Sequence, residues 1–411
     1  MLPALTATTQ LVRLAEFEIH IGGDSELVLR TTAGDFRCGA EGLAILEVFS
    51  QPRALRDGLM ELAARSGAGR QALQDLTNTI HDLYDAGVLR DAHSPAGDLL
   101  ARPGRFDSPE LQISMLEDRT RTQAFLRAIE KTVQPGDIVL DLGTGTGILA
   151  LAAARAGAAH VYAVEAGHIG RSAQALFEAN GMAHKITLIS GWSASVNLPQ
   201  LADVLVSEIL GSRALSERIL PITLDARKRL LKPEARLIPE RLELWGLPVT
   251  VPSEVKDKRS YTPAVLARWQ DWYRFDFTPL QQFAGQLVQV EAQGTAAWPT
   301  LAPPIHLASI DLARFTSSEL TTTVPFQIAT AGKFDGFLVY FDLDVGAGEQ
   351  LTTNPTRINS DCHWLHPVWL MPLAFDVEVG QRFQSTYSTA SSDGGLAHIE
   401  RVPPPAGSTI L

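Results

Sequence analysis

Cysteine is almost absent from this chain of 411 residues. The two cysteines, Cys38 and Cys362, lie far apart and in no spacing that would hold a metal. This scarcity argues against a disulfide framework and against a zinc site, and it fits a reducing cytosol. We therefore expect a cytoplasmic protein without a metal centre.

Excess positive charge and long apolar runs are missing as well. The net charge is −11, and no apolar stretch reaches the roughly 18 residues that a transmembrane helix needs. Residues 1–10 lack the basic and apolar regions of an export signal. Because an acidic chain does not attract phosphate backbones or anionic lipid surfaces, we expect neither a nucleic-acid partner nor a membrane partner. A cationic or neutral substrate fits this charge.

The composition of the whole chain is that of an ordinary globular protein. Its first 92 residues predict a small α+β domain. Short strands are expected at 17–22, 27–32 and 35–39, separated by glycine turns, and three helices and a short return strand follow. A stretch rich in proline, glycine and small polar residues at 93–109 is typical of a linker.

Residues 137–166 carry the most specific pattern in the chain. An apolar strand, a glycine-rich turn, an alanine-rich helix and a second apolar strand form a βαβ unit. The glycines allow a ligand to approach the backbone, and an acid after the second strand can bind ribose hydroxyls. The pattern D-x-G-x-G-x-G favours S-adenosyl-L-methionine over a dinucleotide, and a purely structural turn is the alternative. The predicted cofactor-binding residues are Asp141, Gly143, Gly145, Gly147 and Glu165.

Two glutamates nine residues apart, Glu208 and Glu217, bound the loop SEILGSRALSE. Glu208 follows an apolar strand, and ligands bind at the carboxyl ends of such strands. Two carboxylates repel each other unless a cation or a shared proton lies between them. A guanidinium stays protonated and offers planar donors to both. Arg213 inside the loop is an alternative partner, and two unrelated surface residues are another alternative.

This loop and its surroundings resemble the protein arginine methyltransferase family. Residues 114–129 resemble the helix packed over the methyl donor, and residues 269–284 resemble the dimerisation arm. FLVYFDLDV and NSDCHWLHPVWLM resemble the C-terminal β-barrel and its Thr-His-Trp loop. The resemblance spans roughly residues 106–400, with the motifs in the family's order. It implies a class I Rossmann-like domain, a homodimer and methylation of arginine with S-adenosylmethionine as cofactor.

The resemblance also implies roles for single residues. Arg121 falls on the family's contact to the methionine carboxylate of the cofactor, and Met115 lies in the segment over the methyl donor. An aspartate–histidine pair would hold the surroundings of the second glutamate and help to move a proton; a hydrogen-bonded structural histidine is the alternative for His363. The implied catalytic residues are Glu208, Glu217, His363 and Asp118, and the implied substrate contacts are Glu208, Glu217 and Trp364.

Three positions depart from the family's pattern. The paired tyrosines of the family would fall near Arg102 and Phe106, and the acid on the adenine side falls at about Ala194. The threonine of the barrel loop is Cys362. Substrate access and adenine contacts are therefore expected to differ from the family's.

The N-terminal domain resembles the winged-helix fold of PqqD-like domains, which recognise leader peptides in ribosomal peptide (RiPP) biosynthesis. The resemblance rests on the order of elements and on patterns such as GLAILEVF and LYDAGVL. Eight arginines and no lysine stand against thirteen acids between residues 13 and 92, which opposes DNA binding. Addition of a peptide strand to an exposed sheet edge is favoured. A packing or dimerisation module and DNA binding are the alternatives.

Together, these observations predict an α/β protein of three domains. A winged-helix-like domain at 1–95 precedes a Rossmann-like domain that binds S-adenosyl-L-methionine at 96–240. A β-barrel at 241–411 carries a dimerisation arm at about 255–290. The predicted function is methylation of a precursor peptide or protein, with arginine as the favoured acceptor. Methylation of another nitrogen, oxygen or carbon and a non-catalytic S-adenosylmethionine-sensing regulator are the alternatives.

Overall fold

The chain divides into two compact units, Met1–Ser108 and Pro109–Leu411. The computed structural model describes residues 6–13, 18–21, 27–31, 34–39, 41–66, 70–85, 88–92, 108–167, 169–284, 286–389 and 395–402. Most of the predicted linker and the two positions expected for the tyrosine pair lie outside the described residues.

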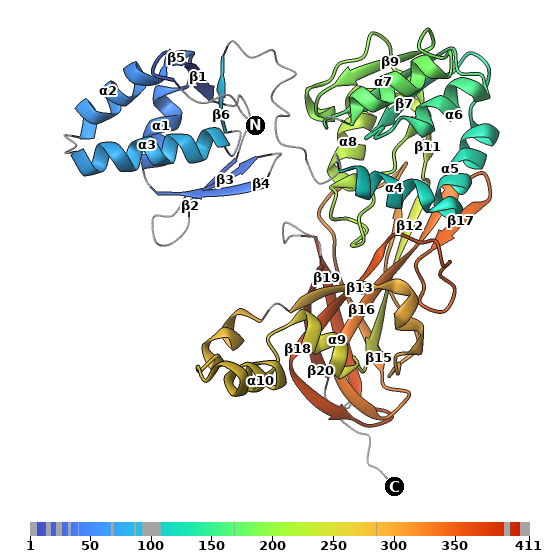
Figure 1. Cartoon of the computed structure of the whole chain (residues 1–411). Coiled ribbons are helices and arrows are strands. Elements are labelled where there is room, and N and C mark those ends of the chain that lie inside the picture. The colour runs from blue at the N-terminus through green and yellow to red at the C-terminus, as the bar shows by residue number, and fades with distance from the viewer. Residues whose placement is uncertain are drawn as a thin grey trace. The chain divides into compact units, whose positions relative to one another are not determined.

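In its described residues, the first unit contains three helices and two small antiparallel sheets, ordered β2-β3-β4 and β5-β1-β6 (Figure 1). The three predicted strands are confirmed as β2 to β4, and the return strand is β6. Sequence reasoning missed β1, which pairs with β6. A winged-helix identity stays a prediction. The elements are β1 (Gln10–Arg13), β2 (Glu18–Ile21), β3 (Leu27–Thr31), β4 (Gly34–Cys38), α1 (Glu41–Val48), β5 (Arg53–Ala54), α2 (Leu55–Ser66), α3 (Arg70–Asp85) and β6 (Leu89–Asp91).

The core of the first unit forms where apolar residues recur at helical spacing. On α3, Leu76, Ile80 and Leu83 are three or four residues apart, and all three are buried. They pack in one cluster with residues of β1, α1 and α2. This unit therefore has its own hydrophobic core.

The described part of the second unit contains a five-stranded parallel sheet, ordered β11-β10-β7-β8-β9. The inner strand β7 is buried along its whole length, as expected for a strand covered on both faces. This sheet confirms the predicted Rossmann-like core. Its elements are β7 (Ile138–Leu142), α6 (Ile148–Ala156), β8 (His160–Glu165), α7 (Gly170–Ala179), β9 (Ile186–Ser190), η3 (Ser193–Ser195), β10 (Ala202–Val206), α8 (Ile219–Arg229) and β11 (Leu231–Ile238).

The segment predicted as one helix over the methyl donor is two helices, α4 (Pro109–Glu117) and α5 (Arg119–Thr132). Asp118 separates them because its side chain accepts a hydrogen bond from the Arg121 amide and so caps α5. This break corrects the sequence expectation.

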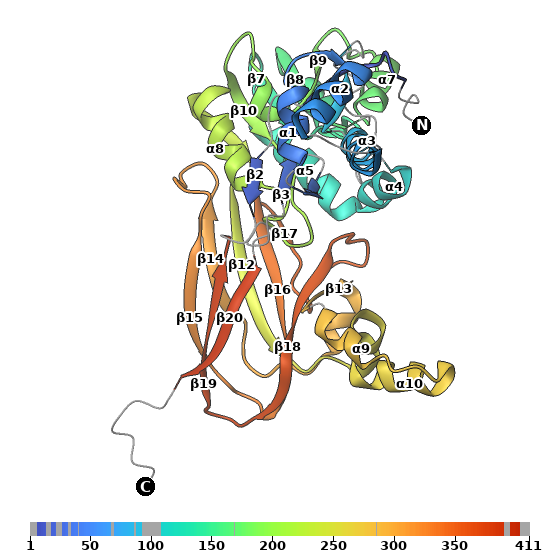
Figure 2. The same cartoon turned by 90° about the vertical axis from the view of Figure 1, so that its left-hand side faces the viewer.

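Two antiparallel sheets follow and pack face to face in a barrel-like arrangement (Figure 2). Aromatic rings fill the space between them, with Phe326 stacked on Phe383 at 5.7 Å and Phe334 edge-on to Phe383 at 5.9 Å. No helix among the described residues is both long and apolar enough to cross a membrane. The strands are β12 (Arg241–Val249), β13 (Leu287–Glu291), β14 (Ile305–Asp311), β15 (Thr321–Gln327), β16 (Gly332–Gly346), β17 (Glu349–Thr352), β18 (Leu365–Val377), β19 (Arg382–Ser388) and β20 (Gly395–Val402), and η5 (Ala292–Ala297) follows β13.

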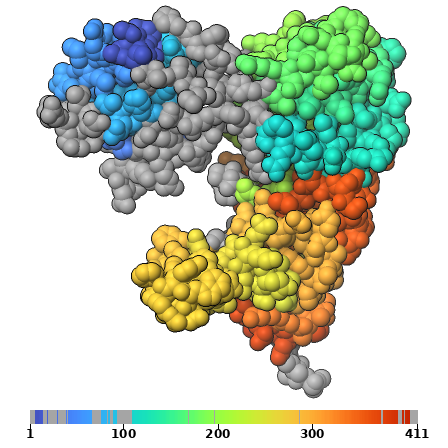
Figure 3. Space-filling view, in the orientation of Figure 1, coloured from blue at the N-terminus to red at the C-terminus, as the bar shows by residue number. Residues whose placement is uncertain are grey.

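A helical arm between β12 and β13 stands out from these sheets as the yellow lobe of Figure 3. It consists of α9 (Ser253–Arg259), α10 (Pro263–Tyr273) and η4 (Thr278–Phe283). Lys256 at its base forms an ion pair with Asp335 of β16, which is 3% exposed. This buried contact anchors the predicted dimerisation arm to the barrel-like sheets.

Candidate active site

The glycine turn joins β7 to α6 and meets a carboxylate from β8. Gly145 has a φ of +56° and Gly147 a φ of +86°, both in the left-handed region that favours glycine. The Glu165 carboxylate accepts hydrogen bonds from the amides of Gly145 at 2.8 Å and Gly167 at 2.7 Å. The predicted cofactor residues of the turn and Glu165 therefore lie together at the carboxyl edge of the sheet.

Asp141, near the end of β7, is buried beside this turn. Its Oδ2 accepts a hydrogen bond from Thr144 Oγ1 at 2.6 Å, whereas its buried Oδ1 has no partner among the described residues. Burial raises the pKa of Asp141 to about 7; the charges of Glu165 and Glu208 act in the same direction, and the Thr144 hydrogen bond opposes them. A buried oxygen without a partner marks a place for a donor from a ligand.

Helix α4 covers the turn through Gln112, which is buried. A Cβ atom on Gly145 would stand 3.7 Å from Gln112 Oε1. Sequence reasoning missed Gln112 because one glutamine within a helix has no spacing signal. On the same helix, the Met115 carbonyl oxygen accepts a hydrogen bond from Arg121 Nη2 at 2.6 Å. Contact of the Met115 side chain with the cofactor stays a prediction.

Arg121 forms an ion pair with Glu208, and both side chains are at least nine-tenths buried. Glu208 Oε1 and Arg121 Nε have no hydrogen-bond partner within the described ranges. Burial raises the pKa of Glu208, while the positive charge of Arg121 and that of a protonated His363 oppose this shift. The structure thus brings the predicted cofactor arginine and the first predicted substrate carboxylate together.

Asp118 and His363 meet as the sequence resemblance implied. Asp118 Oδ2 lies 2.8 Å from His363 Nδ1 and accepts a hydrogen bond from the His363 amide at 3.1 Å. A neighbouring contact joins the same two segments, because Asp361 accepts hydrogen bonds from the Thr120 amide and hydroxyl at 2.9 and 3.0 Å. Sequence reasoning missed Asp361, since nothing local links positions so far apart in the chain.

The loop between the glutamates is supported from below by the barrel-like sheets. Trp364 donates a hydrogen bond from Nε1 to the Leu210 carbonyl at 2.8 Å, and the Leu365 amide donates to Ser212 Oγ at 2.9 Å. Trp364 is 3% exposed, so its observed contact is with the loop, and its contact with a substrate stays a prediction. Glu217 packs against Gly211, where a Cβ atom would stand 3.0 Å from Glu217 Oε1.

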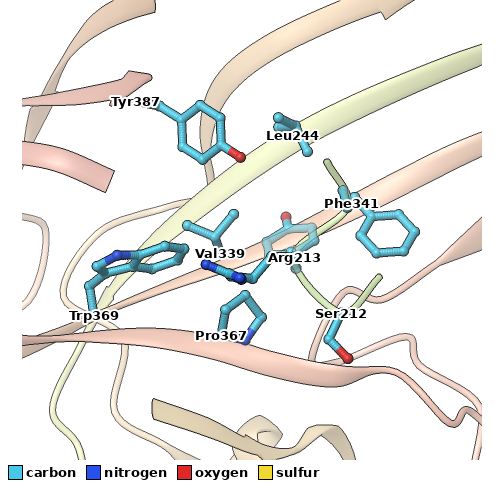
Figure 4. Close-up of a pocket in the computed structure, with 10 residues that line it drawn as sticks. Ser212, Arg213, Leu244, Val339, Phe341, Pro367, Trp369 and Tyr387 are labelled. Atoms are coloured by element: carbon cyan, nitrogen blue, oxygen red, sulfur yellow. The ribbon is translucent and has the colours of Figure 1, made fainter. Parts of the chain in front are cut away.

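Arg213, the possible internal partner of the glutamates, points into a pocket beneath the loop. Figure 4 shows its guanidinium between Trp369, Val339 and Pro367, with the Tyr387 hydroxyl nearby. The ion pair to Glu208 comes instead from Arg121. The geometry gives Arg213 a place in anchoring the loop to the barrel-like sheets.

These residues fit S-adenosylmethionine. The unpartnered Asp141 Oδ1 is an acceptor suited to an amine, and the unpartnered Arg121 Nε is a donor suited to a carboxylate. The methionine part of the cofactor carries both groups. Glu165 stands at the strand end where an acid binds ribose hydroxyls. Among the residues that the structure describes, no group of three or more His, Cys, Asp or Glu could hold a metal ion.

A glycine turn of the order D-x-G-x-G-x-G after one parallel strand and an acid after the next fit a class I S-adenosylmethionine-dependent methyltransferase. Two family models match the chain: "Ribosomal protein L11 methyltransferase (PrmA)" over residues 118–239 and "Arginine methyltransferase oligomerization subdomain" over residues 253–398. Neither matched range includes residues 1–117.

Relatives identify the family. The chain is 31% identical over 313 residues to protein arginine N-methyltransferase 1 of Schizosaccharomyces pombe, covering 74% of this chain and 89% of the relative. It is 30% identical over 278 residues to an arginine N(omega)-methyltransferase of Streptomyces achromogenes, covering 65% of this chain and 73% of the relative. The chain belongs to the protein arginine methyltransferase family, which confirms the resemblance seen in its motifs.

Solved structures agree on the fold. Protein arginine methyltransferase 10 of Arabidopsis thaliana has a TM-score of 0.59 and 26% identity, covering 69% of this chain and 88% of that one. The PRMT1 enzyme-prozyme complex of Trypanosoma brucei with AdoHcy has a TM-score of 0.61 and 21% identity, covering 72% of this chain and 97% of that one. This protein is an S-adenosylmethionine-dependent methyltransferase.

Proposed function

We propose that this methyltransferase modifies a guanidinium nitrogen of arginine in a peptide or protein, and that a ribosomally synthesised precursor peptide is the favoured substrate. One observation carries the acceptor: buried Glu208, one oxygen of which has no hydrogen-bond partner among the described residues, lies on the same short loop as Glu217. Two carboxylates can hold a planar guanidinium in a forked geometry that a lysine ammonium does not match. The names of the relatives agree with this acceptor.

The remaining residues have roles that follow from their contacts. S-adenosylmethionine, when bound, supplies an electrophilic methyl group. Arg121 would bind its methionine carboxylate and Glu165 its ribose. Asp118 fixes one ring nitrogen of His363, so that the other nitrogen is free to accept a proton near the glutamate loop. Arg121 also contacts Glu208, which couples the cofactor side of the site to the substrate side.

Tandem mass spectrometry tests the acceptor directly. The full chain is incubated with S-adenosylmethionine and matched peptides that contain arginine, lysine or citrulline, with free arginine as a fourth substrate. We expect methylation of the arginine peptide alone. A methyl group on another residue would support a different acceptor atom. Transfer to free arginine alone would contradict a peptide or protein substrate. Binding of S-adenosylhomocysteine without any turnover would support a regulator.

The first unit supplies the argument for a peptide substrate. Its β2-β3-β4 sheet has β2 and β4 as its edges within the described residues, and a sheet edge can pair with an extended peptide. The acidic charge of this region opposes a phosphate backbone. With its own core, the unit can act as a tether for the substrate. The whole chain contains only two cysteines, and this scarcity supports a cytoplasmic location for the protein.

Deleting residues 1–95 should raise the KM for a full-length precursor by at least about 10-fold, because a tether increases the effective concentration of the substrate. The affinity for S-adenosylhomocysteine, measured by calorimetry, should not change. A short arginine peptide without a leader should show the same KM with both proteins. Equal KM values of both proteins for the full-length precursor would rule out the tether.

The arm predicts a homodimer. Trp272, Tyr273, Phe275 and Phe283 are 57–71% exposed, and such an apolar surface on a projecting arm fits burial against a second copy. The match to an oligomerization subdomain supports the same assembly. Light scattering should give a dimer mass, and the double variant W272S/F275S should give a monomer. Val379→Ser, an exposed apolar change outside the arm, should remain dimeric. A monomeric wild-type chain would contradict the prediction.

A further inference from the structure

The carboxyl edge of the parallel sheet presents its groups in strand order. Along β10-β7-β8-β9 these are Glu208, the glycine turn, Glu165 and then Trp192, which follows the end of β9 by two residues. In the proposed function, the methyl group lies toward Glu208 and the ribose at Glu165. A ligand that continues in the same direction reaches the end of β9 next. The base of the methyl donor therefore comes to the segment that carries Trp192.

The segment after β9 is held at both ends. Gly191, with a φ of +144°, donates its amide hydrogen to the Glu165 carbonyl at 2.8 Å and so ties the segment to the strand of the ribose acid. Arg229 on α8 donates to the carbonyl oxygens of Ser193 at 2.9 Å and Val196 at 2.8 Å. Trp192 thus projects from a backbone that is fixed on either side.

The side chains of this segment favour stacking as the mode of recognition. Residues 191–197 read GWSASVN and contain no carboxylate that could accept the amino group of adenine. Trp192 is 44% exposed, so part of its indole face is accessible to a ligand. An indole face binds a purine base by stacking, which needs no hydrogen-bonding group at position 194.

We propose that Trp192 forms the adenine-binding face of the methyl-donor site. The inference rests on the proposed function, because the order of groups along the edge defines where the base lies. Trp192 provides affinity for the adenosyl part of the cofactor, while Arg121 and Asp141 act on the methionine part.

Calorimetry and tryptophan fluorescence on the full chain, with S-adenosylhomocysteine as the probe, test this role. Trp192→Ala should raise the Kd about 5- to 150-fold, the range expected for loss of one base–aromatic stack. Trp192→Phe should keep the Kd within about fivefold of wild type but lose the ligand-induced fluorescence quenching. The controls Trp272→Ala and Trp272→Phe change a tryptophan on the arm that is 59% exposed, against 44% for Trp192, and they should alter neither signal.

Two results would overturn the inference: a Kd for Trp192→Ala within about twofold of wild type, or quenching that persists in Trp192→Phe. Unchanged thermal unfolding of Trp192→Ala would show that a higher Kd does not come from misfolding. No binding of S-adenosylhomocysteine by the wild-type chain would instead overturn the cofactor itself. The failure of this inference and the failure of the proposed function are thus distinguishable.

Discussion

Glu208→Gln and Glu217→Gln should each lower the turnover rate by about 30- to 1000-fold, equivalent to about 2–4 kcal/mol of transition-state stabilisation. Glutamine keeps the size and a hydrogen-bond acceptor but removes the charge. If the two carboxylates hold a guanidinium, each variant leaves the cation with half of its counter-charge in a buried site. Steady-state kinetics with an arginine peptide measures the loss.

Glu208 needs a separate control because it also pairs with Arg121. Its replacement is expected to lower the unfolding temperature as well as the rate. Glu243→Gln is the matched control, since Glu243 on β12 lies 2.6 Å from His306 Nε2 and accepts a hydrogen bond from Ser309 Oγ outside the site. It should change the rate little. A Glu208→Gln rate within about threefold of wild type would contradict the clamp.

Glycine 211 offers a way to move the second carboxylate without removing it. A methyl group at Gly211 would overlap Ser216 Oγ and stand 3.0 Å from Glu217 Oε1, so the segment Ser216–Glu217 has to shift. Gly211→Ala is therefore expected to displace Glu217 and to lower the rate in the direction of Glu217→Gln. Because the charge is kept, this variant separates placement from charge.

The fall of kcat/KM at acid pH should reflect the protonation of Glu208. Burial raises the pKa of Glu208, with Arg121 and His363 opposing the shift, so this carboxylate gains its proton at a higher pH than an ordinary glutamate. The protonated group no longer neutralises a guanidinium. The kcat/KM for an arginine peptide should therefore fall with decreasing pH before ordinary glutamates titrate.

The cofactor turn and the glutamate loop were predictable because their signals are local. Gly143 to Glu165 form one βαβ unit, and Glu208 directly follows a buried strand, so short segments already place these groups. Packing decides the rest. The Arg121–Glu208 ion pair and the place of Arg213 depend on how helices, loop and barrel-like sheets meet.

The N-terminal elements and the helix boundaries also divide into features with a local sequence signal and features that depend on distant contacts. Strands β2 to β4 alternate with clear glycine turns, whereas β1 is recognised only through its pairing with β6. The break between α4 and α5 has a cap residue at Asp118, but the apolar pattern continues across it. The cap on the Arg121 amide places the break at Asp118, and the distant His363, which bonds the other oxygen of the same carboxylate, holds the side chain there.

Asp118→Asn should destabilise the second unit by about 1.5–3 kcal/mol, the value of a hydrogen bond to a charged group. In the wild type, the Arg121 amide donates a hydrogen bond to Asp118 Oδ1 at 3.0 Å. The asparagine oxygen can still accept this bond and cap α5. The side-chain NH2 group of the asparagine then faces the backbone amide of His363, which donates to Asp118 Oδ2 in the wild type. Two donors therefore face each other. His363 loses its fixed orientation, so the turnover rate should fall about 10- to 100-fold as well.

Thr120→Val is the matched control for this helix end. It removes the hydroxyl bonds to Asp361 but leaves the cap and His363 intact. We expect a loss of about 1 kcal/mol in stability and a rate near wild type. All seven tryptophans lie in the second unit, so their fluorescence reports the unfolding of that unit. Equal rate losses in both variants would mean that Asp118 supports only the helix.

The pH dependence of stability gives Asp118 a signature of its own. Burial alone would raise the pKa of Asp118, but hydrogen bonds from His363 and from the backbone amides of Arg121 and His363 hold it below the ordinary value of 3.8. A lowered pKa stabilises the folded state above the unfolded value, and this stabilisation disappears as the pH falls through the folded value. The difference in unfolding free energy between wild type and Asp118→Asn should stay constant down to about pH 4 and narrow below it. A difference that stays constant through the acid range would show that the charge of Asp118 does not stabilise this site.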